Sequence, residues 1–251
     1  MESVPPDFLR EGIEGPYPLA ASADELAATA AHILEDVLPV PPTRGRWLPL
    51  ATLLLRMERG SAGLHEAQWR KRQFFMERHL DSSTIRNLCN DRRLRLRLSA
   101  HLGESLLLWR SEIWVSRPGD CLIPAWHHDA YPRLLRGEGR SINAYLALSE
   151  VEEDNGFEYL PAALLAGRRI DAVWTDPFSG NRFFSVPPDL EQGAVRVRLR
   201  AGEFVLFSDD LVHRSIRNTN GRTRVALSLR VAPPSLRILR GYSPRYGPVA
   251  L

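Results

Sequence analysis

Two stretches of this chain, far apart in sequence, carry side chains that together could hold a transition metal. His127 and Asp129 lie two residues apart in the first stretch, and His213 lies in the second. Two imidazoles and one carboxylate form the ligand set that binds non-haem Fe(II) and leaves coordination positions open. Because residues i and i+2 of a strand share one face, His127 and Asp129 are expected to point into one pocket. The spacing therefore predicts an iron site that is open to O2 and a co-substrate.

Each of these residues also has a simpler interpretation when it is taken alone. Asp129 could accept a hydrogen bond from a backbone amide in a capped turn, and a lone histidine such as His213 more often has a structural role. His128 is a rival ligand, but the residue two positions after it is Ala130, which offers no carboxylate. His128 is therefore expected to line the cavity or contact the substrate. The two stretches together, each in a strand-like context, favour metal binding.

A buried cation is expected close to the second stretch. Arg224 lies in an apolar run eleven residues after His213. Burying an arginine in an apolar strand is costly unless it is paired, and a carboxylate matches the planar guanidinium. The carboxylate of a 2-oxoglutarate co-substrate would be such a partner, and Ser215 could donate its hydroxyl to the same group. Arg222 is the rival, but Gly221 before it predicts an exposed turn.

The substrate side of the site is less defined. Arg110 and Glu112 are two residues apart on an expected strand, so both should point the same way. If they face inward, two buried charges need partners, which a polar substrate or the co-substrate would supply. A mutual salt bridge, or an outward and hydrated face, is the alternative.

The fold that must position these residues is predicted to be a single domain over residues 1–251, with 44% hydrophobic and 25% charged residues. Residues 1–103 are expected to form mostly helical support, after an irregular first 20 residues. Helical patterns cover residues 22–37, 47–60, 66–80 and 82–101, although residues 93–98 also fit a strand.

After residue 103 the hydrophobic pattern changes to short runs separated by turn residues, which indicates strands. The expected strands are 106–115, 141–148, 156–160, 194–200, 203–207 and 223–231. The pattern predicts a mainly β fold with a helical N-terminal layer, in which residues 104–232 form a double-stranded β-helix, a cupin-like jelly roll. Residues 162–193 would be an aromatic-bearing loop, either a lid or a satellite cluster, and 233–251 a C-terminal tail.

Composition argues against several classes of partner. A net charge of +3 does not require nucleic acid or an anionic membrane as a partner. No apolar run approaches the roughly 20 residues that span a bilayer. The N-terminus lacks the features of a signal peptide, and the two cysteines are expected to be free thiols. A cytoplasmic monomer or homodimer acting on a small-molecule substrate is expected.

These motifs resemble the phytanoyl-CoA dioxygenase family of Fe(II)/2-oxoglutarate-dependent oxygenases, in particular its bacterial secondary-metabolism branch. The resemblance covers about residues 105–232 and includes Asn155-Gly156, Leu160-Pro161 and residues 201–207 besides the motifs above. It implies that His127, Asp129 and His213 bind Fe(II), and that Arg224 and Ser215 hold the C5 carboxylate of 2-oxoglutarate. It also implies that Tyr145, 18 positions after His127, lies against the co-substrate.

The resemblance implies an oxygenase that uses 2-oxoglutarate and O2. Hydroxylation of a small natural product or an amino-acid-derived metabolite is the expected reaction. Desaturation, cyclisation or epimerisation with the same cofactors is the alternative, followed by a non-catalytic cupin-like protein that binds a metal or ligand. Halogenation is not expected, because halogenating relatives have a small residue where Asp129 stands. Leu160-Pro161 is followed by Ala162-Ala163-Leu164 in place of the family's Gly-Ser-His, so relatives' substrates do not carry over.

Overall fold

The computed structural model describes residues 6–38, 75–241 and 246–251. The helices expected over 47–60 and over most of 66–80 lie outside the described residues, as does most of the Tyr242 to Tyr246 segment. Where the chain is described, both the β core and the helical layer are confirmed.

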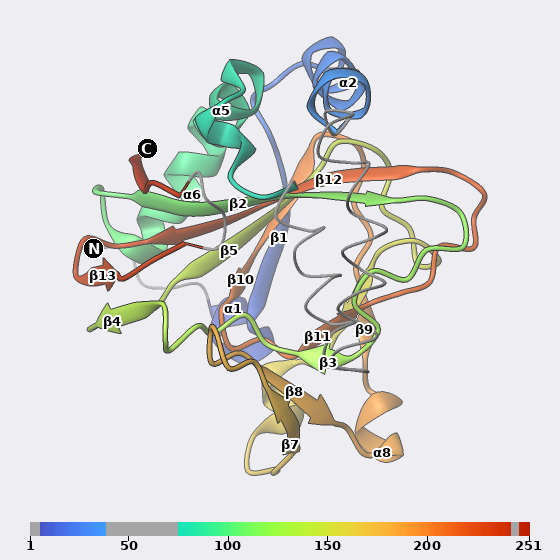
Figure 1. The fold of residues 1–251 in the computed structure, drawn as a ribbon. Helices are drawn as coiled ribbons and strands as arrows, with labels where there is room; N and C mark the ends of the chain where they lie inside the picture. The colour runs from blue at the N-terminus through green and yellow to red at the C-terminus, as the bar shows by residue number, and fades with distance from the viewer. Residues whose placement is uncertain (1–5, 39–74, 242–245) are drawn as a thin grey trace, which may run out of the picture.

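Two six-stranded antiparallel sheets form the core (Figure 1). The major sheet has the order β1 (Ile13–Pro18), β10 (Glu203–Ser208), β5 (Ile142–Ala147), β12 (Arg224–Ala232), β2 (Leu107–Ser116) and β14 (Val249–Ala250). The minor sheet has the order β7 (Asp171–Thr175), β8 (Arg182–Ser185), β3 (Trp126–His127), β11 (His213–Ser215), β6 (Phe157–Tyr159) and β9 (Val195–Arg196). A separate ribbon pairs β13 (Leu236–Ile238) with β4 (Leu135–Gly137).

Short helices complete the described fold. They are α1 (Pro6–Glu11), α2 (Ala23–His32), the π-helical turn η1 (Ile33–Val37), the 3-10 turn η3 (Arg78–Leu80), α5 (Ser83–Cys89), α6 (Arg92–Leu102), α7 (Ala162–Leu165) and α8 (Pro188–Glu191). Ser22 begins α2 with a reciprocal capping box to Glu25, as the sequence predicts. In Figure 1 the helices α2, α5 and α6 lie on one side of the major sheet, and the minor sheet lies on the other.

The strand β12 shows why the two sides of the major sheet differ. Val225, Leu227, Leu229 and Val231 belong to the apolar cluster that also contains the buried faces of α2, α5 and α6. The alternating positions Arg224, Ala226, Ser228 and Arg230 are all buried and point the other way, since successive side chains of a strand alternate. The helical layer therefore covers one face of the sheet, and the other face carries buried polar side chains beside the second apolar cluster, which lies between the two sheets.

The structure corrects several expectations about local structure. Residues 6–18 are not irregular: α1 leads into β1, which pairs with β10 at the edge of the major sheet. Residues 93–98 are helical because Asp91 accepts hydrogen bonds from the first amides of α6, and Leu94 and Leu98 are buried at helical spacing. The expected loop 162–193 contains α7, the β7–β8 hairpin and α8. The tail contributes β14, which pairs with β2.

Cys89 and Cys121 are free thiols, as expected. Within the described ranges, no helix combines the length and the apolar character that a crossing of the bilayer requires.

His79 is a buried histidine that links η3 to β2. Its Nδ1 lies 2.7 Å from Ser111 Oγ, and burial lowers the pKa of the ring to about 4. The native state therefore holds the neutral ring, whereas the unfolded chain takes up a proton near its ordinary value of about 6.5. The contribution of the neutral His79 ring to the free energy of unfolding is therefore fully present above about pH 6.5, and it is lost as the pH falls towards 4.

We expect His79→Asn, which does not titrate, to remove this acid sensitivity. Between pH 7 and pH 5 the free energy of unfolding of the native sequence should fall by about 2 kcal/mol more than that of the variant. Denaturant unfolding of both proteins at the two pH values measures the difference. Equal losses in the two proteins would contradict a neutral His79.

Candidate metal centre

Pairing of β3 with β11 brings the two histidines together. His127 and His213 are directly opposite each other in the antiparallel register of the minor sheet. Their ring centroids are 4.3 Å apart. The pairing of two short strands therefore brings together two histidines that are 86 positions apart in the sequence.

Asp129 joins them from outside the strand. β3 ends at His127, so the expectation that Asp129 shares a strand with His127 is wrong. The backbone amide of Asp129 instead donates to the carbonyl of Asp209 at 2.8 Å, and this bond fixes the turn after β3. The carboxylate still reaches the histidines: its Oδ2 lies 4.0 Å from His213 Nε2.

His127, Asp129 and His213 are all buried, and one ligand atom from each lies within 4.8 Å of the other two. In both histidines Nδ1 lies 3.0 Å from a backbone carbonyl two residues earlier, Ala125 O and Leu211 O respectively. A carbonyl can only accept, so each Nδ1 carries the proton and Nε2 keeps its lone pair. Outer hydrogen bonds of this kind fix the tautomer that a metal requires.

The protonation states also suit a metal. Burial lowers the pKa of His213, which favours the neutral ring despite the opposing charge of Asp129. Burial alone would raise the pKa of Asp129, but the adjacent Arg230 guanidinium outweighs it and holds that pKa well below its usual range. Two neutral imidazoles and one ionised carboxylate fit a divalent ion of the kind expected, with positions left open.

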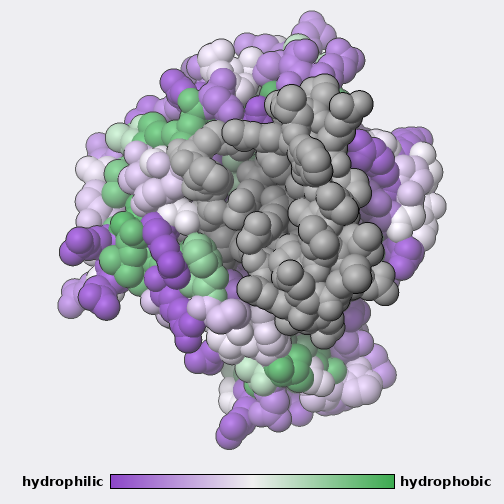
Figure 2. Space-filling view, viewed as in Figure 1, coloured by the Kyte–Doolittle hydropathy of each residue, from purple (hydrophilic) through white to green (hydrophobic). Residues whose placement is uncertain are grey.

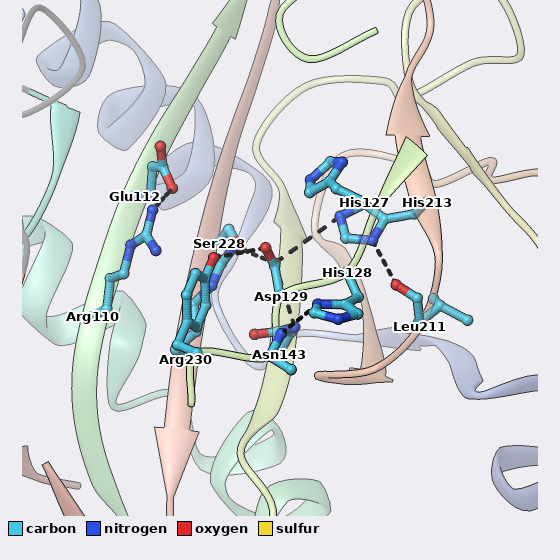
Figure 3. Close-up of polar contacts among 12 residues, drawn as sticks. Arg110, Glu112, His127, His128, Asp129, Asn143, Leu211, His213, Ser228 and Arg230 are labelled. Atoms are coloured by element: carbon cyan, nitrogen blue, oxygen red, sulfur yellow. Dashed lines mark hydrogen bonds and ion pairs between the residues drawn. The ribbon is translucent and has the colours of Figure 1, made fainter. Parts of the chain in front are cut away.

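Arg230 is the residue of this site that sequence reasoning missed. Its Nη2 donates to Asp129 Oδ2 and its Nη1 donates to Ser228 Oγ (Figure 3). Tyr131 Oη donates to the other carboxylate oxygen of Asp129 at 2.7 Å. The signal was present in the sequence: Arg230 is six residues after Arg224 on the same strand, an even spacing that places both on one face.

His128 does not join the metal ligands. Its Nδ1 accepts a hydrogen bond from the amide of Ala130 at 3.3 Å, and its ring lies edge-on to Phe184 at 5.2 Å. The prediction that His127 is the better ligand agrees with this placement. A contact between His128 and a substrate stays a prediction.

Arg224 is buried on the inner face of β12, as expected. Its Nη1 donates to the hydroxyl of Tyr145, the aromatic residue expected beside the co-substrate. Its Nε has no hydrogen-bond partner among the described residues. Ser215 lies two residues after His213 on β11, on the same side of the strand. Arg222 is exposed in the turn before β12. These positions suit the predicted carboxylate site.

Arg110 and Glu112 face inward and also bind each other. Arg110 Nη2 lies 2.7 Å from Glu112 Oε2, and both side chains are almost fully buried. They lie on β2, opposite Arg230 and Ser228 of β12 (Figure 3). The two interpretations left open by the sequence, an inward face and a mutual salt bridge, are therefore both present.

The segment 162–193 provides an aromatic wall beside the metal centre. The Phe183 ring stacks on His127 with centroids 5.5 Å apart, and Trp174 packs on Phe183 at 4.9 Å. Val173 is 67% exposed, and hydrophobic side chains gather around the β7–β8 hairpin in the space-filling view (Figure 2). The hairpin thus links the surface to His127, one of the candidate metal ligands.

Solved structures with the same fold include several non-haem iron enzymes. ThoJ, a non-haem monooxygenase in its apo form, has a TM-score of 0.65 at 18% identity, covering 94% of this chain and 79% of its own. The epimerase SnoN, in complex with Fe3+, alpha-ketoglutarate and nogalamycin RO, has a TM-score of 0.62 at 20% identity, covering 95% and 84%. CytC3 with Fe(II) and alpha-ketoglutarate has a TM-score of 0.60 at 16% identity, covering 96% and 85%.

These three structures share the fold of this chain, and the described residues include a His127–Asp129–His213 cluster that could hold a metal ion. No curated protein matches the chain in sequence. A family model does: residues 21–226 match phytanoyl-CoA dioxygenase (PhyH), and the chain belongs to this family. The match agrees with the resemblance drawn from the sequence motifs.

We expect the binding of a metal ion to require His127, Asp129 and His213, and not His128. Asp129→Ala and His213→Ala should each weaken Co(II) binding by more than about 100-fold, because groups that merely orient a ligand already contribute about 10–100-fold. His128→Ala, the matched control, should bind Co(II) within about 3-fold of the native sequence. Titration of the metal-free proteins, followed by the cobalt absorption spectrum, measures both. Loss of the metal in the His128 variant alone would show that the ligands are assigned wrongly.

Proposed function

We propose that this protein is an Fe(II)/2-oxoglutarate-dependent oxygenase that hydroxylates a small natural product or an amino-acid-derived metabolite. The observation that carries the proposal is the placement of Arg224 on the wall opposite the His127–Asp129–His213 cluster. A buried arginine with an unused Nε–H needs an anion, and the metal ligands leave coordination positions for one. One dicarboxylic keto acid satisfies both needs.

In this proposal His127, Asp129 and His213 hold Fe(II), which with O2 and 2-oxoglutarate supplies oxidation of an unactivated C–H bond. Arg224 and Ser215 bind the C5 carboxylate of the co-substrate, and Tyr145 supports the arginine through its hydroxyl. Arg224 is only 3% exposed, and its removal from water strengthens its hold on a carboxylate. Binding and orientation of the co-substrate are thus assigned to residues of β12, β11 and β5.

Hydroxylation is preferred because Asp129 is positioned by Arg230 and Tyr131 towards the histidines and keeps its place as a ligand. Arg110 and Glu112 on β2, and His128 in the segment after β3, are proposed to contact the substrate. Desaturation, cyclisation and epimerisation use the same cofactors and are distinguished by product analysis. SnoN, a structural neighbour, is described as an epimerase.

Arg224→Lys should raise the KM for 2-oxoglutarate by about 10-fold or more, because the bidentate geometry is lost and a charged hydrogen bond contributes about 1.5–3 kcal/mol. Arg222→Lys, in the exposed turn before β12, is the matched control and should change KM less than about 2-fold. Succinate formation and O2 uptake measure both. A silent Arg224 variant beside an impaired Arg222 variant would overturn the assignment.

The native sequence should not halogenate. Turnover in excess chloride or bromide, once a substrate is in hand, should give only oxygenated product by mass spectrometry, because Asp129 occupies the position that a halide would need. Asp129→Gly should lose most oxygenation without gaining halogenation, since a halide pocket also needs surrounding donors. Halogenated product from the unchanged enzyme would refute this prediction.

A further inference from the structure

The ribbon of β4 and β13 has an apolar inner face and a charged outer face. Leu135, Leu236 and Ile238 pack into the apolar cluster beneath the ribbon. Arg136 and Arg237 lie between these positions in the sequence, so their side chains point to the opposite face. Both arginines are exposed. The outer face of the ribbon therefore presents two guanidinium groups to solvent.

The register of the ribbon places these two arginines directly opposite each other. The neighbouring Gly137 fixes this register, because it has a φ of +132° and a Cβ there would lie 2.3 Å from the carbonyl oxygen of Ser235. The Cβ atoms of directly opposite residues are about 4.5–5.5 Å apart, and like charges in this arrangement destabilise the strand pair. The ribbon thus holds two guanidinium groups side by side against their mutual repulsion.

The surroundings of the pair are positively charged as well. Five arginines and one acidic residue, Glu138, lie in residues 131–140 and 233–241. Arg140 pairs with Asp210 at 2.9 Å, whereas Arg133 and Arg240 donate to backbone carbonyls of the β7–β8 turn, which carry no formal charge. Figure 2 shows hydrophilic side chains at the edge of the molecule where Figure 1 places β4 and β13.

Neither Arg136 nor Arg237 forms a side-chain hydrogen bond or ion pair with any residue that the structure describes. Arginine presents its N–H donors as a planar fork, which binds two oxygens of an anion at once. A carboxylate has two oxygens and one charge, so it satisfies one fork. A phosphate monoester has three terminal oxygens and a charge of about −1.5 to −2 at pH 7, so it can bridge two forks.

The size of the face also limits the ligand. Each strand of the ribbon is three residues long. A stable protein–protein interface requires about 800 Å² from each partner, which is more than the outer face of two such strands provides. The face therefore suits one small anion better than a macromolecule.

We propose that Arg136 and Arg237 form a binding site for the phosphate group of a small molecule, either the free ion or an ester. The site is separate from the candidate metal centre, because the apolar cluster lies beneath the ribbon and Tyr131 of that cluster is the residue that reaches Asp129. The family match ends at residue 226, so Arg237 lies outside the part of the chain that it covers. The inference does not depend on the proposed function.

The test is calorimetric titration of the metal-free protein at low ionic strength, where screening is weak and the probe has no metal to coordinate. The probes are phenyl phosphate, inorganic phosphate and benzoate, which has the same ring as phenyl phosphate but a carboxylate. The ribbon variants are the double substitutions of Arg136 and Arg237 to glutamine and to lysine. The matched control is Arg92→Gln with Arg95→Gln, an exposed pair on α6 with the same change of charge.

Phenyl phosphate should bind at least about 10-fold more tightly than benzoate, because the dianion engages both forks. The glutamine pair on the ribbon should weaken phosphate binding at least about 10-fold, and the lysine pair should lie between, since it keeps the charge but loses the forks. The α6 control should stay within about 2-fold. Circular dichroism should be unchanged in all variants, because the substituted side chains are exposed.

The two phosphates identify the source of the group. Tighter binding of phenyl phosphate than of inorganic phosphate supports a site for an ester, and the reverse order supports a site for the free ion.

Four results would overturn the inference. Phosphate binding that is unchanged in the glutamine pair would place the anion elsewhere, and a loss confined to Arg224→Lys would place it at the proposed co-substrate site. Equal losses in the ribbon and α6 variants would show a general attraction to positive charge. No binding of either phosphate at about 10 mM would exclude the site.

Discussion

The ion pair between Arg230 and Asp129 is the interaction on which the rest of the site depends. It joins the major sheet, through β12, to the turn that follows β3 of the minor sheet. Both side chains are almost fully buried, and removing one partner of such a pair typically costs about 3–5 kcal/mol because the other charge is left without compensation. The pair therefore ties the position of Asp129, a candidate metal ligand, to the packing of the two sheets. Tyr131 completes the arrangement by occupying the second oxygen of Asp129.

Side chains on the outer face of the minor sheet support the two strands that carry the histidines. Trp126 precedes His127 and Arg214 follows His213, so both point to the outer face when the histidines point inward. Arg214 lies over the Trp126 ring at 4.3 Å, and both donate to Glu191 Oε1 at the end of α8. This network fixes the short strands β3 and β11, which by themselves have too few backbone hydrogen bonds to hold a register. It also ties the segment 162–193 to the strands that carry the ligands.

How far the sequence predicted this site depends on the range of the interaction involved. Alternation and turn residues are local, so the strand of Arg224 and its burial could be predicted. The pairing of His127 with His213 could not be worked out from periodicity, because β11 is three residues long and its register is set by its neighbours. Asp129 points towards the histidines because of a bond to Asp209, not because of strand alternation. The first strand was missed because its one glycine and two prolines are typical of loops, whereas an edge strand tolerates them.

The two sides of the site, one from each sheet, differ in chemical character. The wall that carries the metal ligands is apolar and aromatic: Phe183 stacks on His127, and Phe157 packs edge-on against His213 at 6.0 Å. The wall opposite carries the buried arginines of β12 and β2. A molecule bound between these walls gains most when its charged groups face the arginines and its apolar part faces the histidines. The fold thereby directs the carbon skeleton of a bound molecule, and not its anionic end, towards the side where oxidation is proposed to occur.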